Sequence, residues 1–262
     1  MQLTIQNIIH KIKQNQFIYE ELVKRDFKKR YARTALGMLW SILNPLLQLL
    51  IMRLVFTHFF GGRIPHYTTY LFSGMVIFNY FSESTREGMT TLVDNQAIFS
   101  KINVPKYLFL FAKNTQSLIN FLLILVIFFV FCALDQVVFS WKFLLLIFPV
   151  VCLVIFNLGA GLLLSAFYIF FLDVQYFWNI FLQLLQYVSA LFYQIETFPE
   201  NIQKLFYLNP IYLYIDYFRK IIIYGTIPAL WIHLLILAEA LLMFVFGVLV
   251  YRKYNWEFLY YI

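Results

Sequence analysis

Long apolar segments separated by short polar ones dominate the pattern of the chain. A bilayer core about 30 Å thick requires roughly 20 helical residues, and a window of that length finds six such segments. Their approximate limits are Gly37–Phe60, Tyr67–Thr90, Leu108–Leu134, Phe143–Phe171, Tyr176–Tyr193 and Ala229–Tyr251. The pattern therefore predicts an all-α integral membrane protein with six transmembrane helices.

Basic residues mark one side of this predicted membrane protein. Twelve lysines and arginines precede the first span, separate the second from the third, or follow the sixth, whereas five lie on the opposite side. Because cytoplasmic segments carry the excess of basic residues, both termini are predicted to be cytoplasmic. The chain divides into an N-terminal cytoplasmic segment (1–36), a transmembrane domain (37–251) and a cytoplasmic tail (252–262).

Residues 196–228 fit neither a span nor an ordinary loop. Their apolar runs of about ten residues are interrupted at Asn209-Pro210 and by charged side chains, and such runs are more often re-entrant or interfacial than spanning. We expect two short re-entrant helices that enter from the outer face and are separated at Pro210. A surface loop with aromatic interface anchors is the alternative.

The N-terminal segment contains a basic amphipathic stretch at residues 17–35. Tyr19, Val23, Phe27 and Tyr31 recur every four residues, and lysines and arginines occupy other positions around the helix. This pattern predicts a helix that lies in the membrane interface with its cations near anionic lipid headgroups. A simple anchor with no further role fits the same pattern.

The connection at residues 94–106 is predicted to fold into a short helix. Asp94 or Asn95 can cap its start, and Pro105 ends it. The helix would expose three apolar side chains to the cytoplasm, those of Ile98, Phe99 and Ile102. Because exposed apolar surface of this kind indicates a partner, we interpret the segment as a docking element.

The composition agrees with a membrane protein and excludes several functions. Charged residues make up 13% of the chain, whereas soluble domains average about 25%. The sequence contains no GxxxxGK[ST], HExxH or GxSxG motif, so we expect no catalytic residues, no metal site and no nucleotide site on this chain. The net charge of +7 follows from the topology and requires no nucleic-acid partner.

Charged residues inside the predicted spans are functional candidates, because a charge is costly to hold in a bilayer. Arg53 lies in the first span, Glu83 and Arg86 in the second, and Glu239 in the sixth. They are too few for a proton relay or a voltage sensor. We expect them to pair, Glu83 with Arg86 on one helix face and Arg53 with Glu239 between helices.

The fourth span carries small or polar residues at regular spacing. Asn157, Gly161 and Ser165 are four residues apart, with Gly159 between the first two. Small residues let helix backbones approach closely in membranes. This span is therefore predicted to pack tightly against a neighbouring helix.

Three segments of the chain read RDFKKRYARTALGMLWSILNPLLQLLIMRLVFTHFF (Arg25–Phe60), FSKINVPKY (Phe99–Tyr107) and LNPIYLYIDYFRKIIIYG (Leu208–Gly225). In this order, and on a six-span profile, they resemble the type-2 ABC transporter permeases that export polysaccharides such as O-antigens, capsular and rhamnose polymers, and teichoic acids. The resemblance extends from Arg25 to Arg252.

The resemblance implies a multi-pass permease of the bacterial plasma (inner) membrane. Such a permease acts as a homodimer with two cytoplasmic ATP-binding subunits, which would bind ATP and Mg²⁺ and hydrolyse the ATP. This chain would be a transport subunit without a cofactor or an enzyme activity of its own. Its substrate would be a lipid-linked polysaccharide, moved out of the cytoplasm across the surrounding membrane lipids.

The resemblance also implies roles for particular residues. The interface helix against the ATPase would carry Arg25, Asp26, Lys29 and Tyr31. The coupling helix, at about residues 94–106, would present Asn95, Ile98, Phe99, Lys101, Ile102 and Pro105. The broken segment at about residues 196–228 would form gate helices at the outer mouth of the channel.

Aromatic residues make up 21% of the chain, more than girdles at two membrane interfaces need. Sugar rings have apolar faces that stack on aromatic side chains, so an aromatic channel would hold a polymer weakly in many registers. The candidates near the outer mouth are Tyr187, Phe192, Tyr193, Tyr212, Tyr214 and Tyr217. Contact with lipid or with the second copy is the alternative for each.

Two other functions stay open at this point. An ABC exporter of a drug or a small lipid would belong to the same superfamily. A membrane-embedded transferase acting on lipid-linked sugars would need paired acids or histidines at one membrane face, and the sequence shows none.

Overall fold

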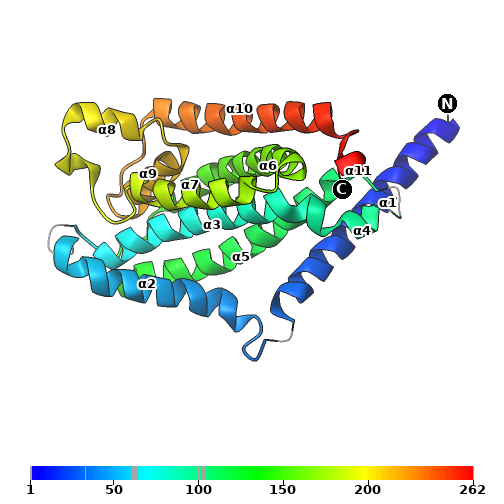
Figure 1. The fold of residues 1–262 in the computed structure, drawn as a ribbon. Helices are drawn as coiled ribbons and strands as arrows, with labels where there is room; N and C mark the ends of the chain where they lie inside the picture. Colours follow the sequence, from blue (N-terminus) through cyan, green and yellow to red (C-terminus); the bar gives the residue numbers. More distant parts are fainter. Residues whose placement is uncertain (1, 33, 61–63, 100, 102–103, 262) are drawn as a thin grey trace.

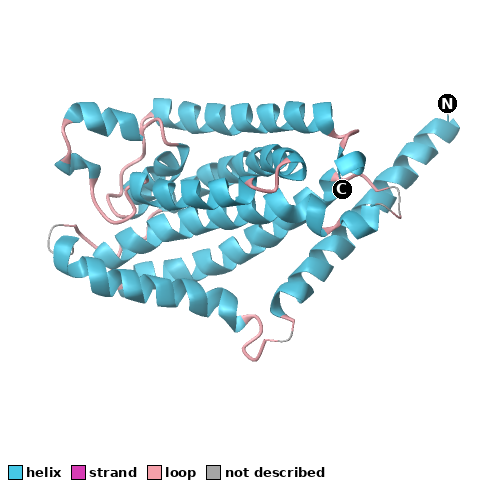
Figure 2. Cartoon of the chain, viewed as in Figure 1, coloured by secondary structure: helices cyan, strands magenta, loops and turns pink. Residues whose placement is uncertain are grey.

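The computed structural model describes residues 2–32, 34–60, 64–99, 101 and 104–261. Helices are the only regular elements in these ranges (Figure 2), which confirms the predicted all-α class. In chain order they are α1 (Gln2–Tyr31), α2 (Leu39–Phe60), α3 (Tyr67–Asp94), α4 (Gln96–Phe99), α5 (Tyr107–Leu134), η1 (Trp141–Leu146), α6 (Ile147–Phe170), α7 (Val174–Val188), η2 (Ile195–Thr197), α8 (Glu200–Phe206), α9 (Pro210–Ile222), α10 (Leu230–Tyr254) and α11 (Phe258–Tyr261).

Four helical segments in the described ranges are long and apolar enough to cross a membrane. They are α2, α5, the continuous η1–α6 segment and α10, and each coincides with a predicted span. α3 and α7 coincide with the other two, but α3 carries several charged residues and α7 is only 15 residues long. The chain is therefore an integral membrane protein, and its described residues include four helices of spanning length and hydropathy.

The predicted extension of the fifth span to Tyr193 is wrong. α7 ends at Val188, and the chain turns at Ala190, whose φ of 51° lies in the left-handed region. The Arg219 guanidinium of α9 donates to the carbonyl oxygens of Ala190 and Leu191 at 2.9 and 3.0 Å. A residue distant in the sequence thus stabilises a turn that local hydropathy does not reveal.

α3 lies at the centre of the bundle, in contact with α2, α5, α6, α7 and α9 (Figure 1). Its Phe72 is buried and packs edge-on against Phe128 and Phe131 of α5, with ring centroids 5.5 and 5.4 Å apart. Because lipid is as apolar as these rings, such contacts stabilise the bundle through close packing and not through removal from water.

Glycines allow the backbone of α6 to approach two neighbouring helices closely. A Cβ atom added at Gly159 would lie 2.5 Å from the carbonyl oxygen of Met243 on α10, and Gly247 of α10 meets the Gly159 backbone in the same contact. On the other side, a Cβ atom added at Gly88 of α3 would lie 3.1 Å from the Gly161 Cα. The tight packing predicted for the fourth span is confirmed.

The segment between α7 and α10 forms two short helices, α8 and α9, separated at Pro210 as predicted. Asn209 caps α9, since its side-chain oxygen accepts from the N–H groups of Ile211 and Tyr212 at 3.0 and 3.4 Å, and Pro210 suits the first helical position. α9 is buried along most of its length, partly against α3. Figure 1 places α8 and α9 at the opposite end of the bundle from α4 and the C-terminus.

The predicted amphipathic helix is the second half of α1, and its apolar face packs against α5. Ile18 and Leu22 pack with Leu108 and other apolar side chains at the start of α5, and the Tyr19 hydroxyl bonds the Thr115 hydroxyl at 2.5 Å. The first turns of α5 offer complementary apolar surface, so the helix covers α5 (Figure 1).

The segment after α10 folds back onto the connection before α5. The Lys106 ammonium donates to the Asn255 carbonyl at 2.9 Å and lies 5.6 Å from the centre of the Phe258 ring. Burial lowers the pKa of Lys106. The residues predicted as a tail therefore pack against the body of the protein.

Candidate functional site

Five charged side chains from three helices meet where the C-terminal part of α1 crosses the bundle. Arg30 of α1 bonds Glu83 of α3 at 2.5 Å and lies 3.3 Å from Glu87. Lys113 of α5 lies 3.4 Å from Glu87 and 3.8 Å from Asp26 of α1. We call this group the charge cluster. It joins α1 to both α3 and α5.

Further side chains complete the charge cluster. Arg25 pairs with the buried Asp26 at 2.6 Å, which balances three carboxylates with three cations. Asn120 donates to Glu83 at 3.0 Å, and Gln116 donates to the Asp26 backbone carbonyl at 3.3 Å. Because buried charges are costly unless paired and hydrogen-bonded, this balance explains how α3 tolerates acidic residues inside the bundle.

Both ion pairs predicted from the sequence are wrong. Glu83 pairs with Arg30 of another helix, whereas Arg86, one turn along α3, is exposed. Arg53 and Glu239 lie on α2 and α10, which run on opposite sides of the bundle (Figure 1). Spacing within one helix could not identify Arg30, because it belongs to a helix outside the predicted spans.

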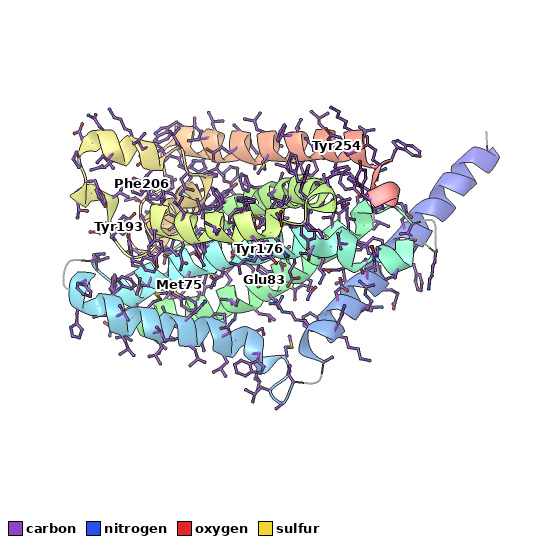
Figure 3. All side chains as sticks on the ribbon, in the orientation of Figure 1. Met75, Glu83, Tyr176, Tyr193, Phe206 and Tyr254 are labelled. Carbon is purple, nitrogen blue, oxygen red and sulfur yellow. The ribbon has the colours of Figure 1, made fainter. Side chains whose placement is uncertain are left out.

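A polar cleft of about 490 Å³ adjoins the charge cluster, between the end of α1 and helices α2, α3 and α5. Figure 3 labels Glu83, which belongs to both the charge cluster and the cleft wall. α3 contributes Asn79, Glu83 and Arg86, whose spacing of four and three residues places them on one helix face. The other polar lining side chains include Trp40, Ser41, Asn44, Gln48 and Asn120.

A proline shapes the α2 wall of this cleft. Pro45 lies inside α2 and lines the cleft. Because proline has no N–H group, the carbonyl of Ser41 four residues earlier lacks its helical donor. Across the cleft, Asn79 of α3 donates to the Gln48 side chain of α2 at 3.1 Å and ties the two walls together.

α4 occupies the connection predicted as the coupling helix. Asn95, just before it, accepts from Arg25 of α1 at 2.8 Å and donates to the Thr91 carbonyl at 2.8 Å. Ile98 is half-buried and packs with Leu22 in an apolar cluster, so it is not the exposed residue that was expected. Its burial follows from α1, which covers this side of the connection.

The remaining coupling residues show a mixed arrangement. Lys101 is exposed, and Pro105 is half-buried directly before α5. Ile102 and the Phe99 side chain lie outside the described residues. A groove of about 350 Å³ runs between α1 and the connection, lined by residues that include Phe17, Ile98 and Val104.

The predicted interface residues of α1 divide into inward and outward positions. Asp26 is buried in the charge cluster, Arg25 bonds Asn95, and Lys29 is exposed. The Tyr31 side chain lies outside the described residues. One face of α1 therefore anchors the helix, and the other leaves basic side chains open.

Most of the six predicted channel aromatics are packed inside the protein. Tyr212, Tyr214 and Tyr217 lie on the buried faces of α9, and Phe192 stacks on Phe56 of α2 with ring centroids 4.5 Å apart. Tyr193 is partly buried and Tyr187 is 62% exposed. Tyr187 is thus the one of the six with a freely accessible ring in this structure.

Two functional candidates were missed in the sequence. Lys113 lies near the start of the apolar α5. A single cation within the first two turns of an otherwise apolar helix was the sequence feature that could have identified it as a candidate. Arg219 is 3% exposed, with its guanidinium carbon 3.4 Å from the centre of the Tyr70 ring and a bond to the Tyr70 carbonyl at 3.2 Å. No local pattern distinguishes it from an ordinary loop cation.

The family model for the ABC-2 type transporter matches residues 19–223, from α1 through α9. The chain belongs to the ABC-2 type transporter family. This confirms the resemblance seen in the sequence. The matched residues include the charge cluster, the polar cleft and α4.

Named relatives of this ABC-2 chain are described as polysaccharide transport proteins. It is 26% identical over 243 residues to the O-antigen export system permease protein RfbA of Klebsiella pneumoniae, covering 90% of this chain and 92% of that protein. It is 27% identical over 208 residues to the RfbA of Myxococcus xanthus (78% and 79%) and 22% identical over 211 residues to the polysialic acid transport protein KpsM of Escherichia coli (79% and 82%).

Proposed function

We propose that this chain is the membrane subunit of an ATP-driven exporter that moves a lipid-linked polysaccharide out of the cytoplasm. The observation that carries the proposal is the match to the ABC-2 type transporter family over residues 19–223, together with relatives named for O-antigen export and polysialic acid transport. Because these relatives align over most of both chains, the comparison concerns the whole transport subunit and not a shared fragment.

Six spans complete the proposed architecture in the bacterial plasma membrane, with both termini in the cytoplasm. α3 and α7 would span beside the four apolar helices. The glutamates of α3 do not oppose this arrangement, because Glu83 and Glu87 are paired with Arg30 and Lys113 inside the bundle. α8 and α9 would be the re-entrant pair at the outer face, which is supported by their place at the end opposite α4.

A separate ATP-binding subunit, carrying ATP and Mg²⁺, would dock on α1 and α4. The groove of about 350 Å³ between α1 and the connection is apolar enough to take part of a partner helix. The Arg25–Asn95 bond joins α1 to α4, so a force on either element reaches the other. Lys29 of α1 and Lys101 of the connection are exposed cations of these two elements.

Two copies of the chain would form the channel. α7 exposes a long apolar face in one protomer, which comprises Tyr176, Phe177, Ile180, Phe181, Leu184 and Tyr187. The aromatic rings among them suit either a second copy or the apolar faces of sugar rings. Tyr187 would then be the candidate for polymer contact among the aromatics named from the sequence.

The test combines purification with a cellular phenotype. The tagged chain is purified from native membranes in mild detergent, and co-purifying ATPase activity is measured against a tagged membrane protein from another family. In parallel, cells depleted of the chain are examined for lipid-linked polymer retained on the cytoplasmic side. Co-purified ATPase with retained polymer supports the proposal. Normal surface polymer after depletion refutes it, and retention of a drug or a small lipid instead would favour the other exporter class.

A further inference from the structure

Three side chains that line the polar cleft have no partner among the residues that the structure describes. Trp40, Asn44 and Arg86 make no side-chain hydrogen bond, ion pair or ring contact there. By contrast, Glu83 and Gln48 of the same cleft are bonded to neighbouring side chains. The cleft therefore presents an indole, an amide and a guanidinium with their bonding capacity unused.

The charge of the cleft favours an anion. Its two carboxylates, Glu83 and Glu87, are already bonded to Arg30 and Lys113, so Arg86 supplies the uncompensated charge. An arginine inside a membrane protein is costly without a counter-ion. A guanidinium also presents several N–H donors in a planar fork that matches phosphate oxygens.

The α2 wall adds groups that suit a sugar ring. Trp40 is 44% exposed, and an indole face is a stacking surface for the apolar face of a sugar. The Asn44 amide can both donate to and accept from hydroxyl groups. The Ser41 carbonyl, left without its helical donor by Pro45, is a further acceptor for a hydroxyl.

The outward face of α2 suits the lipid part of such a molecule. Leu47, Leu50, Ile51 and Leu54 are exposed on the same helix that carries Trp40 and Asn44. A ligand with a polar head and a long apolar chain would place the head in the cleft and leave the chain in the bilayer beside these side chains. This arrangement requires no change in the conformation of α2.

We propose that the cleft binds the phosphate and the first sugar of a lipid-linked glycan, with the phosphate on Arg86 and the sugar ring on Trp40. This inference deepens the proposed function and rests on it. It names the part of the substrate that is recognised and the side chains that recognise it. The lipid chain contributes attachment to the membrane, whereas the cleft supplies the selectivity for the headgroup.

Binding is measured on the permease assembled with its ATP-binding subunits in phosphatidylcholine nanodiscs. The probes are a radiolabelled polyprenyl phosphohexose, the matching polyprenyl phosphate and the uncharged polyprenol. Loss of a charge-assisted bond predicts that Arg86→Gln binds the first two probes about 10- to 100-fold more weakly, and Arg86→Lys restores part of the affinity. Trp40→Leu should weaken binding of the phosphohexose while leaving polyprenyl phosphate unchanged.

Arg53→Gln is the matched control, because it removes another exposed arginine of a membrane helix outside the cleft. Its binding should equal that of the unaltered chain. Inorganic phosphate and phosphatidylglycerol are added as competitors, and neither should displace the phosphohexose. Equal displacement by phosphatidylglycerol would make the cleft a general lipid-phosphate site, and displacement by inorganic phosphate a free-anion site; either result overturns the proposal.

The outcomes separate this inference from the proposed function. Unchanged phosphohexose affinity in Arg86→Gln, with normal glycan export, refutes the headgroup site and leaves the exporter intact. Equal weakening of polyprenol would also refute it, because polyprenol has no phosphate for Arg86 to bind. Normal export in cells that lack the chain refutes the exporter itself, whatever the cleft binds.

Discussion

Removing Arg30 should destabilise the bundle, because α1 is joined to α3 through this side chain. Arg30→Gln deletes the 2.5 Å contact with Glu83 and the 3.3 Å contact with Glu87. Glu87 keeps Lys113, whereas Glu83 loses its cation and keeps the hydrogen bond from Asn120. Stranding one member of a fully buried pair costs about 3–5 kcal/mol.

The cost here should be smaller, since the side chains of Arg30, Glu83 and Glu87 are 28%, 24% and 29% exposed and solvent screens part of the interaction. We expect a loss of about 2–3 kcal/mol in the free energy of unfolding, below the value for a fully buried pair. This corresponds to a fall of about 30- to 150-fold in the folded-to-unfolded ratio.

Equilibrium unfolding in mixed detergent micelles, followed by tryptophan fluorescence, measures this loss. Lys28→Gln is the matched control, because Lys28 is an exposed cation on the same helix and its loss should change the free energy by less than about 0.5 kcal/mol. The double variant Arg30→Gln with Glu83→Gln should recover much of the stability, since the stranded carboxylate is gone. Equal effects of Arg30→Gln and Lys28→Gln, or simple additivity in the double variant, would refute the reasoning.

Three further outcomes follow from the packing and the surface of the protein. Gly159→Ala should destabilise the protein by about 1–3 kcal/mol through overpacking, because the new Cβ atom would lie 2.5 Å from a backbone oxygen of α10. Gly161→Ala is the control and should be tolerated, because the nearest atom to its new Cβ lies at 3.7 Å. Thermal aggregation of the two variants in detergent is compared. Arg219→Met should lower stability by about 3 kcal/mol, because the carbonyl oxygens of Ala190, Leu191 and Tyr70 each lose a hydrogen bond from the guanidinium. Lys204→Met, which removes an exposed cation of α8, serves as its control in the same unfolding assay. Phe99→Asp should abolish export while leaving membrane insertion and elution as a folded particle unchanged, and normal polymer on such cells would contradict the docking role of the connection.

The fold could be predicted from the sequence wherever one segment determines its own structure. The helices of spanning length follow from hydropathy alone, and the break at Pro210 follows from Asn209, which caps α9 with its own side chain. The end of α7 could not be predicted in this way. Its turn depends on Arg219, which comes about 30 residues later.

The candidate site was less accessible to sequence reasoning for the same physical reason. Glu83 and Arg86 were correctly identified as charges that require an explanation, but their partners were assigned by spacing within a helix. The partner that Glu83 has, Arg30, is set by the angle at which α1 crosses α3 and α5. Likewise, the apolar pattern of α1, which recurs every four residues, could indicate burial without indicating whether lipid or protein covers it.

The charge cluster and the polar cleft share one turn of α3, so neither can move independently of the other. Arg30 bonds Glu83 and also lines the cleft that contains Arg86, and Arg25 of the same α1 holds Asn95 beside α4. A displacement of α1 by the proposed ATP-binding subunit must therefore either break the Arg30–Glu83 pair or carry that turn of α3 with it, and a displacement of α4 does the same as long as the Arg25–Asn95 bond holds. Both results alter the walls of the cleft. Because coupling between two binding sites is reciprocal, a headgroup bound in the cleft would change the affinity for ATP by the same factor by which ATP changes the affinity for the headgroup.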